Sequence, residues 1–236
     1  MTHFRRISLA GAAALFLAAA AYAQTGFPFK DESLHYNIDW PSGLSLGEST
    51  FTATRTASGW NFAMTLNGAV PGFAVADKVR SSATADLCSL EFQRDLSQGS
   101  RKSREKTVFD QAKGTAHRTT LFPEGGGKSE FDIPSCARDA LTFLYYARRE
   151  LGQGRVPPPG KVFFGGAYSV RMDYTGAMTI PLGDKPPQVT DHLVVSVKGQ
   201  KTDFSFDIYF ARDPARTPVL VKVPFAIGTI SMELAQ

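Results

Sequence analysis

The sequence has few of the residues that build metal or redox centres. Two of its 236 residues are cysteine and four are histidine. Cys88 and Cys136 lie far apart, without the paired short spacing of a zinc site, and His35, His117 and His192 form no short-range cluster with them. We therefore expect neither a metal site nor a cofactor.

The chain also lacks an apolar run long enough to cross a membrane. Its most apolar segment, Leu9–Ala21, has about 13 residues, whereas a membrane-spanning helix needs roughly 20. Two arginines precede this segment, and Ala21-Tyr22-Ala23 places small residues where a signal peptidase cleaves. We predict that residues 1–23 are a cleaved signal peptide and that residues 24–236 form a soluble periplasmic protein without a membrane anchor.

A strong excess of charge of one sign is missing as well. Without the two arginines of the leader, 24 basic residues stand against 22 acidic ones, so we expect no nucleic-acid partner. The densest basic stretch is interrupted by two acidic residues and consists of Arg94, Arg101, Lys102, Arg104 and Lys106. We interpret it as a solvated hairpin, with contact to anionic lipid head groups or an acidic glycan as the alternative.

The even number of cysteines in an exported chain favours one disulfide. We expect Cys88 to bond to Cys136. The bond would close a loop of about 50 residues and contribute about 3 to 4 kcal/mol in the chain-entropy model. Two buried free thiols are the alternative.

Alternation of apolar and polar side chains predicts a mainly β protein. The first such segment has the pattern of a strand with one buried face. Its polar residues alternate with Leu34, Tyr36, Ile38 and Trp40. Similar patterns between turn residues predict strands at 48–55, 60–66, 74–84, 88–95, 103–110, 115–122, 162–174, 177–181, 189–199, 202–211, 217–223 and 226–234.

One segment has the period of a helix. Its apolar residues recur at spacings of three, four and seven, which predicts a helix over 135–151 with Ser135 as N-cap and Gly152 at its end. Three prolines at 157–159 then predict an extended connector between two β-rich halves. We expect residues 24–236 to form a single domain, a curved antiparallel sheet or open barrel-like roll with one central helix.

Four consecutive helix residues, Phe143, Leu144, Tyr145 and Tyr146, cannot all face one way. A helix that is apolar on more than one side is either buried in a β shell or covers an apolar pocket. Core packing is our first interpretation. In the alternative, Phe143, Tyr145 and Tyr146 are possible ligand-lining residues.

Two segments look like catalytic or phosphate-binding motifs, but the residues around them do not fit the structures that those motifs need. Gly43-Leu44-Ser45-Leu46-Gly47 matches the G-x-S-x-G pattern of a hydrolase, but a threonine-rich strand pattern follows it where the nucleophile elbow needs a helix. Gly125-Gly126-Gly127-Lys128 lacks the spacing of a phosphate-binding loop and is typical of a hairpin turn. We predict that the protein is not an enzyme, and we assign no catalytic residue.

Several segments along the chain follow the pattern of a known family. They are Glu32–Trp40, Gly43 with Gly47-Glu48, Val108-Phe109-Asp110, Asp132-Ile133-Pro134, Asp139–Tyr146, Ile208–Asp213, Arg216–Val219 and Phe225–Gly228. In these segments the chain resembles the DUF3108 family of exported bacterial envelope proteins. The resemblance implies an envelope protein and brings no established activity or catalytic residues with it.

Two classes of function follow from these patterns. The first is a non-catalytic protein of the cell envelope with a structural or assembly role and an unknown envelope partner. The alternative is a binding module for a lipid or other apolar ligand on the concave side of the sheet, and a hydrolase is a distant third. A cavity of several hundred cubic ångströms beside the helix would favour the binding module.

Overall fold

The computed structural model describes residues 30–70, 73–183, 185–225 and 228–235. The predicted signal peptide, residues 1–23, lies outside these ranges, as does the beginning of the predicted strand at 226–234. Among the described residues, no helix is long and apolar enough to cross a membrane.

The described chain folds into one sheet of fifteen strands and one helix. The helix α1 spans Ala140–Gly152. The strands are β1 (Glu32–Asp39), β2 (Ser45–Arg55), β3 (Gly59–Val70), β4 (Phe73–Thr84), β5 (Ser89–Gln98), β6 (Arg101–Asp110), β7 (Thr115–Phe122), β8 (Lys128–Asp132), β9 (Arg138–Asp139), β10 (Gly160–Phe163), β11 (Ala167–Leu182), β12 (Lys185–Gly199), β13 (Thr202–Ala211), β14 (Pro218–Phe225) and β15 (Gly228–Leu234).

The strands form two meanders that meet at the two ends of the chain. Their order is β8-β7-β6-β5-β4-β3-β2-β1-β15-β14-β13-β12-β11-β10-β9, so β1 pairs with β15, and Tyr36 lies opposite Leu234. All pairs are antiparallel except β9 with β10, which are parallel. Because β8 and β9 stand at the two ends of this order, the sheet is open rather than closed.

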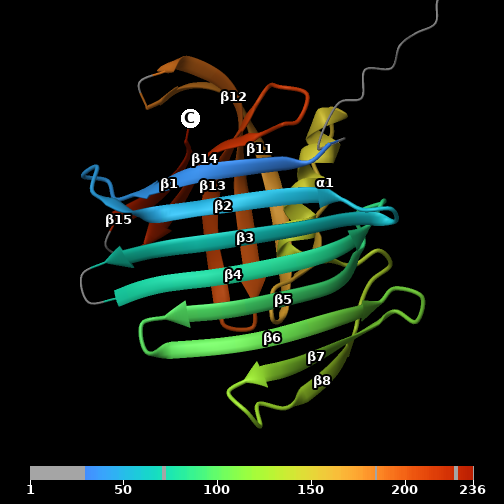
Figure 1. Cartoon of the computed structure of the whole chain (residues 1–236). Helices are drawn as coiled ribbons and strands as arrows, with labels where there is room; N and C mark the ends of the chain where they lie inside the picture. Colours follow the sequence, from blue (N-terminus) through green and yellow to red (C-terminus); the bar gives the residue numbers. More distant parts are fainter. Residues whose placement is uncertain (1–29, 71–72, 184, 226–227, 236) are drawn as a thin grey trace, which may run out of the picture.

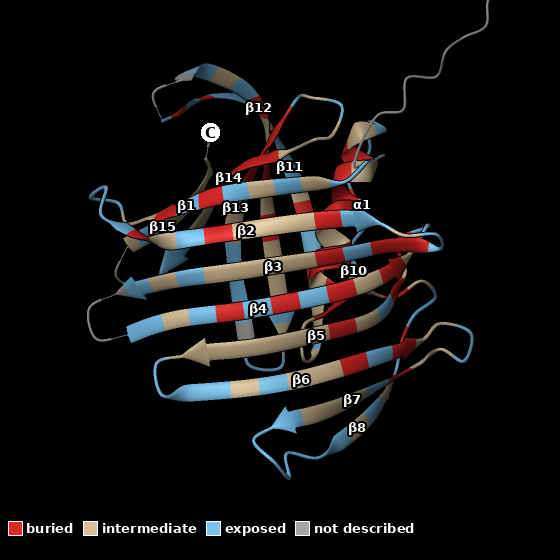
Figure 2. Ribbon diagram, in the orientation of Figure 1, coloured by how far each residue is buried: buried red, intermediate tan, exposed pale blue. Residues whose placement is uncertain are grey.

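The two meanders form two layers with the helix at one side. Figure 1 shows β2–β6 running across the front, β11–β13 running up and down behind them, and α1 beside both. Figure 2 shows that the buried residues of β3, β5 and β6 gather toward the side where α1 lies. The predicted fold, a mainly β, curved and open antiparallel sheet with one central helix, is confirmed.

The helix contributes to the cores of both layers. Leu141 and Tyr145 belong to a cluster with buried residues of β2–β7, such as Phe62. Ala147 and Leu151 belong to a second cluster, built mainly by β10–β14. The consecutive apolar residues of the helix are therefore explained by two apolar surroundings on its different sides.

The helix begins later than the sequence predicted. Its N-cap is Asp139, whose carboxylate accepts hydrogen bonds from the backbone nitrogens of Leu141 and Thr142, so the prediction of Ser135 as cap was wrong. Ala137, two residues before this cap, instead bonds to Gln111 and to the backbone nitrogen of Ser89. These long-range bonds hold the segment before Asp139 out of the helix, whereas the predicted end at Gly152 is confirmed.

Several strands also differ from the sequence prediction. The segment 162–174 contains two strands, β10 and β11, divided by a turn in which Gly165 has φ +69°. Because β11 continues to Leu182, the prediction of a separate strand at 177–181 was wrong. The short strands β8 and β9 were not predicted, since β8 has only five residues and β9 only two. Such short edge strands carry little periodicity that a sequence pattern can reveal.

Candidate ligand-binding cavity

An apolar cavity of about 530 Å³ lies between α1 and the two layers of the sheet. The front layer contributes Phe51, Met64 and Val79. The helix contributes Ala140, Leu141, Phe143, Leu144 and Ala147. The rest of the wall is Val162, Phe164, Tyr168, Val170, Met172, Val195, Val197, Phe204, Phe206, Ile208, Val221 and Met232.

The pairing of β11–β13 brings apolar side chains together on the wall of the cavity. Met172 lies opposite Val195, which lies opposite Phe206. The next inward row consists of Val170, Val197 and Phe204. Because alternate residues of a strand face the same side, the two rows form one continuous apolar surface.

The wall carries one polar group, the hydroxyl of Tyr168, among otherwise apolar side chains. Binding pockets for small molecules commonly measure about 300–1,000 Å³ and are lined mainly by apolar residues. A water molecule inside such a wall finds few hydrogen-bond partners. The cavity is therefore chemically suited to a hydrocarbon chain.

The helix residues singled out from the sequence do not share one site. Phe143 lines the cavity. Tyr145 is fully buried in the core, where its ring stacks on Phe62 with 4.2 Å between centroids. Tyr146 lies instead at a neighbouring pocket. Leu144, which was not among the predicted lining residues, does line the cavity.

A helical stripe could have identified the lining side of α1. Four lining residues of the helix follow the spacing i, i+3, i+4 and i+7, which places them on one side of it. They are Ala140, Phe143, Leu144 and Ala147. Tyr145, one residue further around the helix, faces the core of the front layer. The sequence alone did not show which of the two apolar sides would be left unfilled.

A second pocket of about 520 Å³ adjoins the cavity, and Phe143 lines both. The second pocket is formed by residues 132–138, Phe143, Tyr146 and residues 158–161. Within it the guanidinium of Arg138 lies 3.7 Å from the centroid of the Tyr146 ring, and its Nη2 is 3.2 Å from the Sγ of Cys136. Burial lowers the pKa of Arg138, although a guanidinium remains charged at neutral pH.

The predicted disulfide between Cys88 and Cys136 is confirmed and borders the second pocket. The two Cα atoms are 4.6 Å apart, and the bond joins the start of β5 to the segment that leads into β9 and α1. No free cysteine is found in the described ranges. The bond therefore fixes the chain next to Arg138.

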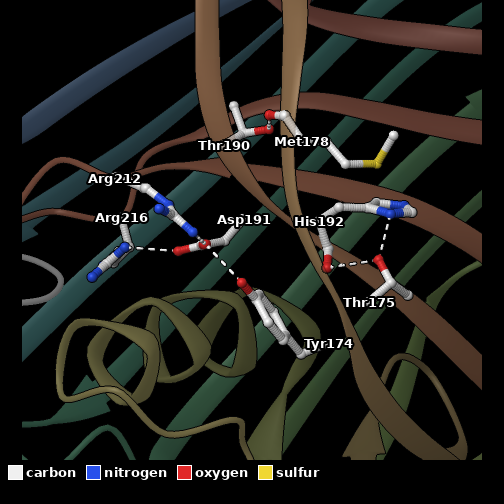
Figure 3. A network of polar contacts seen from close by, with 8 residues as sticks. All are labelled: Tyr174, Thr175, Met178, Thr190, Asp191, His192, Arg212 and Arg216. Carbon is white, nitrogen blue, oxygen red and sulfur yellow. Dashed lines mark hydrogen bonds and ion pairs between the residues drawn. The ribbon is translucent and has the colours of Figure 1, made fainter.

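A polar cluster links β11, β12 and β13 elsewhere on the sheet, and Figure 3 draws its members Thr175 and His192. The Nδ1 atom of His192 is 2.6 Å from the hydroxyl of Thr175, and its Nε2 atom is 2.7 Å from Asp207. A hydroxyl, an imidazole and a carboxylate in this order resemble a hydrolase triad. None of the three residues lines the apolar cavity or the second pocket. We therefore interpret their hydrogen bonds as contacts that stabilise the pairing of the three strands.

A neighbouring ion-pair cluster in Figure 3 holds the loop after β13. Arg212 and Arg216 each lie 2.8 Å from a carboxylate oxygen of Asp191 on β12, and the hydroxyl of Tyr174 donates to the same side chain. The hydrogen bond with Asp191 raises the pKa of Arg212. The cluster fixes the connection between β13 and β14.

The basic stretch of the sequence lies on the β5–β6 hairpin, where three of its cations have carboxylate partners. The ion pairs are Arg94 with Glu105 at 2.7 Å, Arg104 with Asp95 at 2.9 Å and Lys106 with Glu91 at 2.7 Å. This cross-strand pairing of opposite charges is typical of a solvated hairpin.

The other motifs singled out from the sequence lie in simple β structure. Ser45 is exposed and begins β2, so a strand follows it rather than a helix. Gly125, Gly126 and Gly127 lie in the turn between β7 and β8, and Lys128 begins β8. Within the described ranges, no group of three or more histidine, cysteine, aspartate or glutamate residues is placed to hold a metal ion.

The comparisons with known proteins identify a family and a fold. Among solved structures, the chain is similar to a β-barrel-like protein of the domain of unknown function DUF1849 from Brucella abortus, with a TM-score of 0.60 and 9% sequence identity. The similarity covers 86% of this chain and 95% of that one, and at this identity it shows the fold alone. No curated protein matches the chain. The family model "Protein of unknown function (DUF3108)" matches residues 34–235, and the chain therefore belongs to the DUF3108 family.

Proposed function

We propose that the protein is a non-catalytic binding protein that holds a lipid or other apolar ligand in the cavity beside α1. The observation that carries this proposal is a space of about 530 Å³ with an almost wholly apolar wall. Burying apolar surface releases about 25 cal/mol per Å². A hydrocarbon chain in the cavity is stabilised by this effect without needing any polar partner along the wall.

The size of the cavity argues against ordinary core packing. Protein interiors are close-packed and contain few voids larger than a water molecule. Apolar side chains that line an unfilled pocket lose such packing contacts and face water instead. A bound apolar ligand restores the missing contacts of residues such as Met172 and Phe206, which line the space.

A structural or assembly role with an unknown envelope partner is the second candidate. The open sheet favours it, because β8 is the last strand on one side of the strand order. An edge strand offers unpaired backbone groups to which a strand of another protein can bind.

The proposal includes export to the periplasm. Its support is the leader pattern of residues 1–23 together with the Cys88–Cys136 disulfide, because disulfides persist in oxidising compartments. The protein isolated from the periplasmic fraction should have the mass of a chain that begins at Gln24. A chain that keeps residues 1–23 and stays in the cytoplasm would contradict this part of the proposal.

Native mass spectrometry of protein purified from the periplasm tests the ligand directly. We expect the wild type to carry an apolar molecule and Val195→Trp to carry much less, because Val195 lines the cavity and a larger ring occupies its space. Val108→Trp is the matched control, since Val108 is exposed and lines neither pocket. A wild type that carries no ligand and binds no added long-chain alcohol would refute the proposal.

The absence of catalysis is tested with a fluorophosphonate probe, which reacts with activated serine hydroxyls. We expect no labelling of Ser45, because this exposed residue begins a strand and lacks the helix that a nucleophile elbow needs. Labelling that disappears in Ser45→Ala would show that the protein is a hydrolase instead.

A further inference from the structure

We propose that the ligand is an anionic amphiphile whose charged head group binds Arg138 in the second pocket while its apolar tail lies in the cavity. This inference rests on the proposed function and adds the chemical class of the ligand. It follows from two observations: the two spaces share a wall residue, and the charge of Arg138 has no carboxylate partner.

Phe143 belongs to the walls of both the apolar cavity and the charged pocket. Tyr146 follows one helical turn later, with 6.1 Å between the two ring centroids, and belongs only to the second pocket. The hydrocarbon wall and the wall that carries charge therefore meet at one side chain, that of Phe143.

Arg138 lacks the carboxylate partner that several other buried or partly buried arginines have. Arg94 is paired with Glu105 and Arg148 with Glu32. Among the described residues, Arg138 forms no ion pair, and its buried Nε atom has no hydrogen-bond partner. A partly buried charge of this kind gains most from an added anion, because the cost of its burial has not been offset.

The stacking of Arg138 also favours an anionic head group. Its guanidinium lies 3.7 Å from the centroid of the Tyr146 ring, which holds the planar group in place. A fixed guanidinium presents parallel N–H donors whose geometry matches a carboxylate or a phosphate.

The other charges around the pocket leave an excess of positive charge. Lys161 on β10 lines the same pocket, and so does one carboxylate, Asp132. On the helix, Glu150 is already bound by Arg155 at 2.8 Å and lies 3.8 Å from Arg149. The two cations of the pocket wall therefore outnumber its one carboxylate.

Matched ligands of equal chain length test the inference. We expect the mature wild-type protein, freed of bound lipid, to bind hexadecanoate at least about tenfold more tightly than hexadecanol, since only the carboxylate gains a charge-assisted bond to Arg138. In Arg138→Gln the preference for hexadecanoate should disappear while hexadecanol binding stays the same. Displacement of a fluorescent fatty-acid analogue measures all four affinities.

The control is Arg55→Gln. Arg55 also lies over an aromatic ring, that of Trp60, but lines neither pocket, so this variant should keep the wild-type preference. Equal binding of the two ligands by the wild type would overturn the inference even if Arg138→Gln failed to fold, and would leave the apolar cavity as a binding site. Failure of the wild type to bind either ligand would instead refute the proposed function.

Discussion

Asp139 joins the first turn of the helix to two strands of the front layer. One carboxylate oxygen accepts the backbone N–H groups of Leu141 and Thr142, at 2.9 and 3.0 Å. The other accepts the hydroxyl groups of Ser81 on β4 and Ser89 on β5, each at 2.5 Å. Burial raises the pKa of Asp139, and these hydrogen bonds oppose the increase. These hydrogen bonds attach the start of the helix to the sheet.

We predict that Asp139→Ala lowers the free energy of unfolding by about 3 kcal/mol or more, because several buried donors lose their acceptor at once. Ser135→Ala is the control, since Ser135 is exposed and does not cap the helix. Its effect should stay within about 0.5 kcal/mol. Urea unfolding measures both values, and similar losses in the two variants would contradict the assigned cap.

At the scale of elements, a buried ion pair fastens α1 to β1. Arg148 is fully buried, and both of its terminal nitrogens contact the carboxylate of Glu32, with Nη2 at 3.0 Å. Its Nε atom donates to the carbonyl of Ala215 in the loop between β13 and β14. One side chain of the helix thus holds the first strand and a loop of the second meander together.

We predict strong coupling between Glu32 and Arg148 in a double-mutant cycle. Arg148→Met or Glu32→Leu alone should cost about 3 to 5 kcal/mol, because each removes one partner of an ion pair whose guanidinium is fully buried. The double variant should cost clearly less than the sum of the two single changes. Free energies of unfolding in urea for the four proteins give the coupling, and additive effects would show that the pair does not act as a unit.

At the scale of the whole molecule, the two meanders share a sheet and a helix. The pairing of β1 with β15 continues the sheet from one meander to the other. The helix adds residues to the core clusters of both layers. Neither layer can therefore lose its packing without exposing apolar residues of the other.

We predict that the oxidised protein unfolds in one cooperative transition. Both tryptophans, Trp40 and Trp60, lie in the first meander, so their fluorescence reports on that half, whereas far-UV circular dichroism reports on all fifteen strands. The two signals should change at the same urea concentration. Two separate midpoints would mean that the meanders are independent units.

The sequence by itself determined the features that depend on neighbours along the chain. The period of two in β1, at Tyr36 and Ile38, follows from the alternation of side chains in a strand, and the helical spacing after residue 140 follows from the turn of a helix. The disulfide followed from the even cysteine count and the predicted compartment. These features depend on the spacing of neighbouring residues or on composition, so they can be predicted without knowing the fold.

Only the tertiary structure decided where the helix begins and where the cavity and its charge lie. The helix starts at Ala140 because Ala137 is bonded to β5 and Gln111. Arg138 comes to lie over Tyr146, and Phe143 between the two pockets, because parallel pairing of β9 with β10 sets the sheet edge beside α1. The alternation in each strand predicts which side is apolar. Whether that side is filled depends on the distance between the two layers and the helix, which is a property of the folded chain alone.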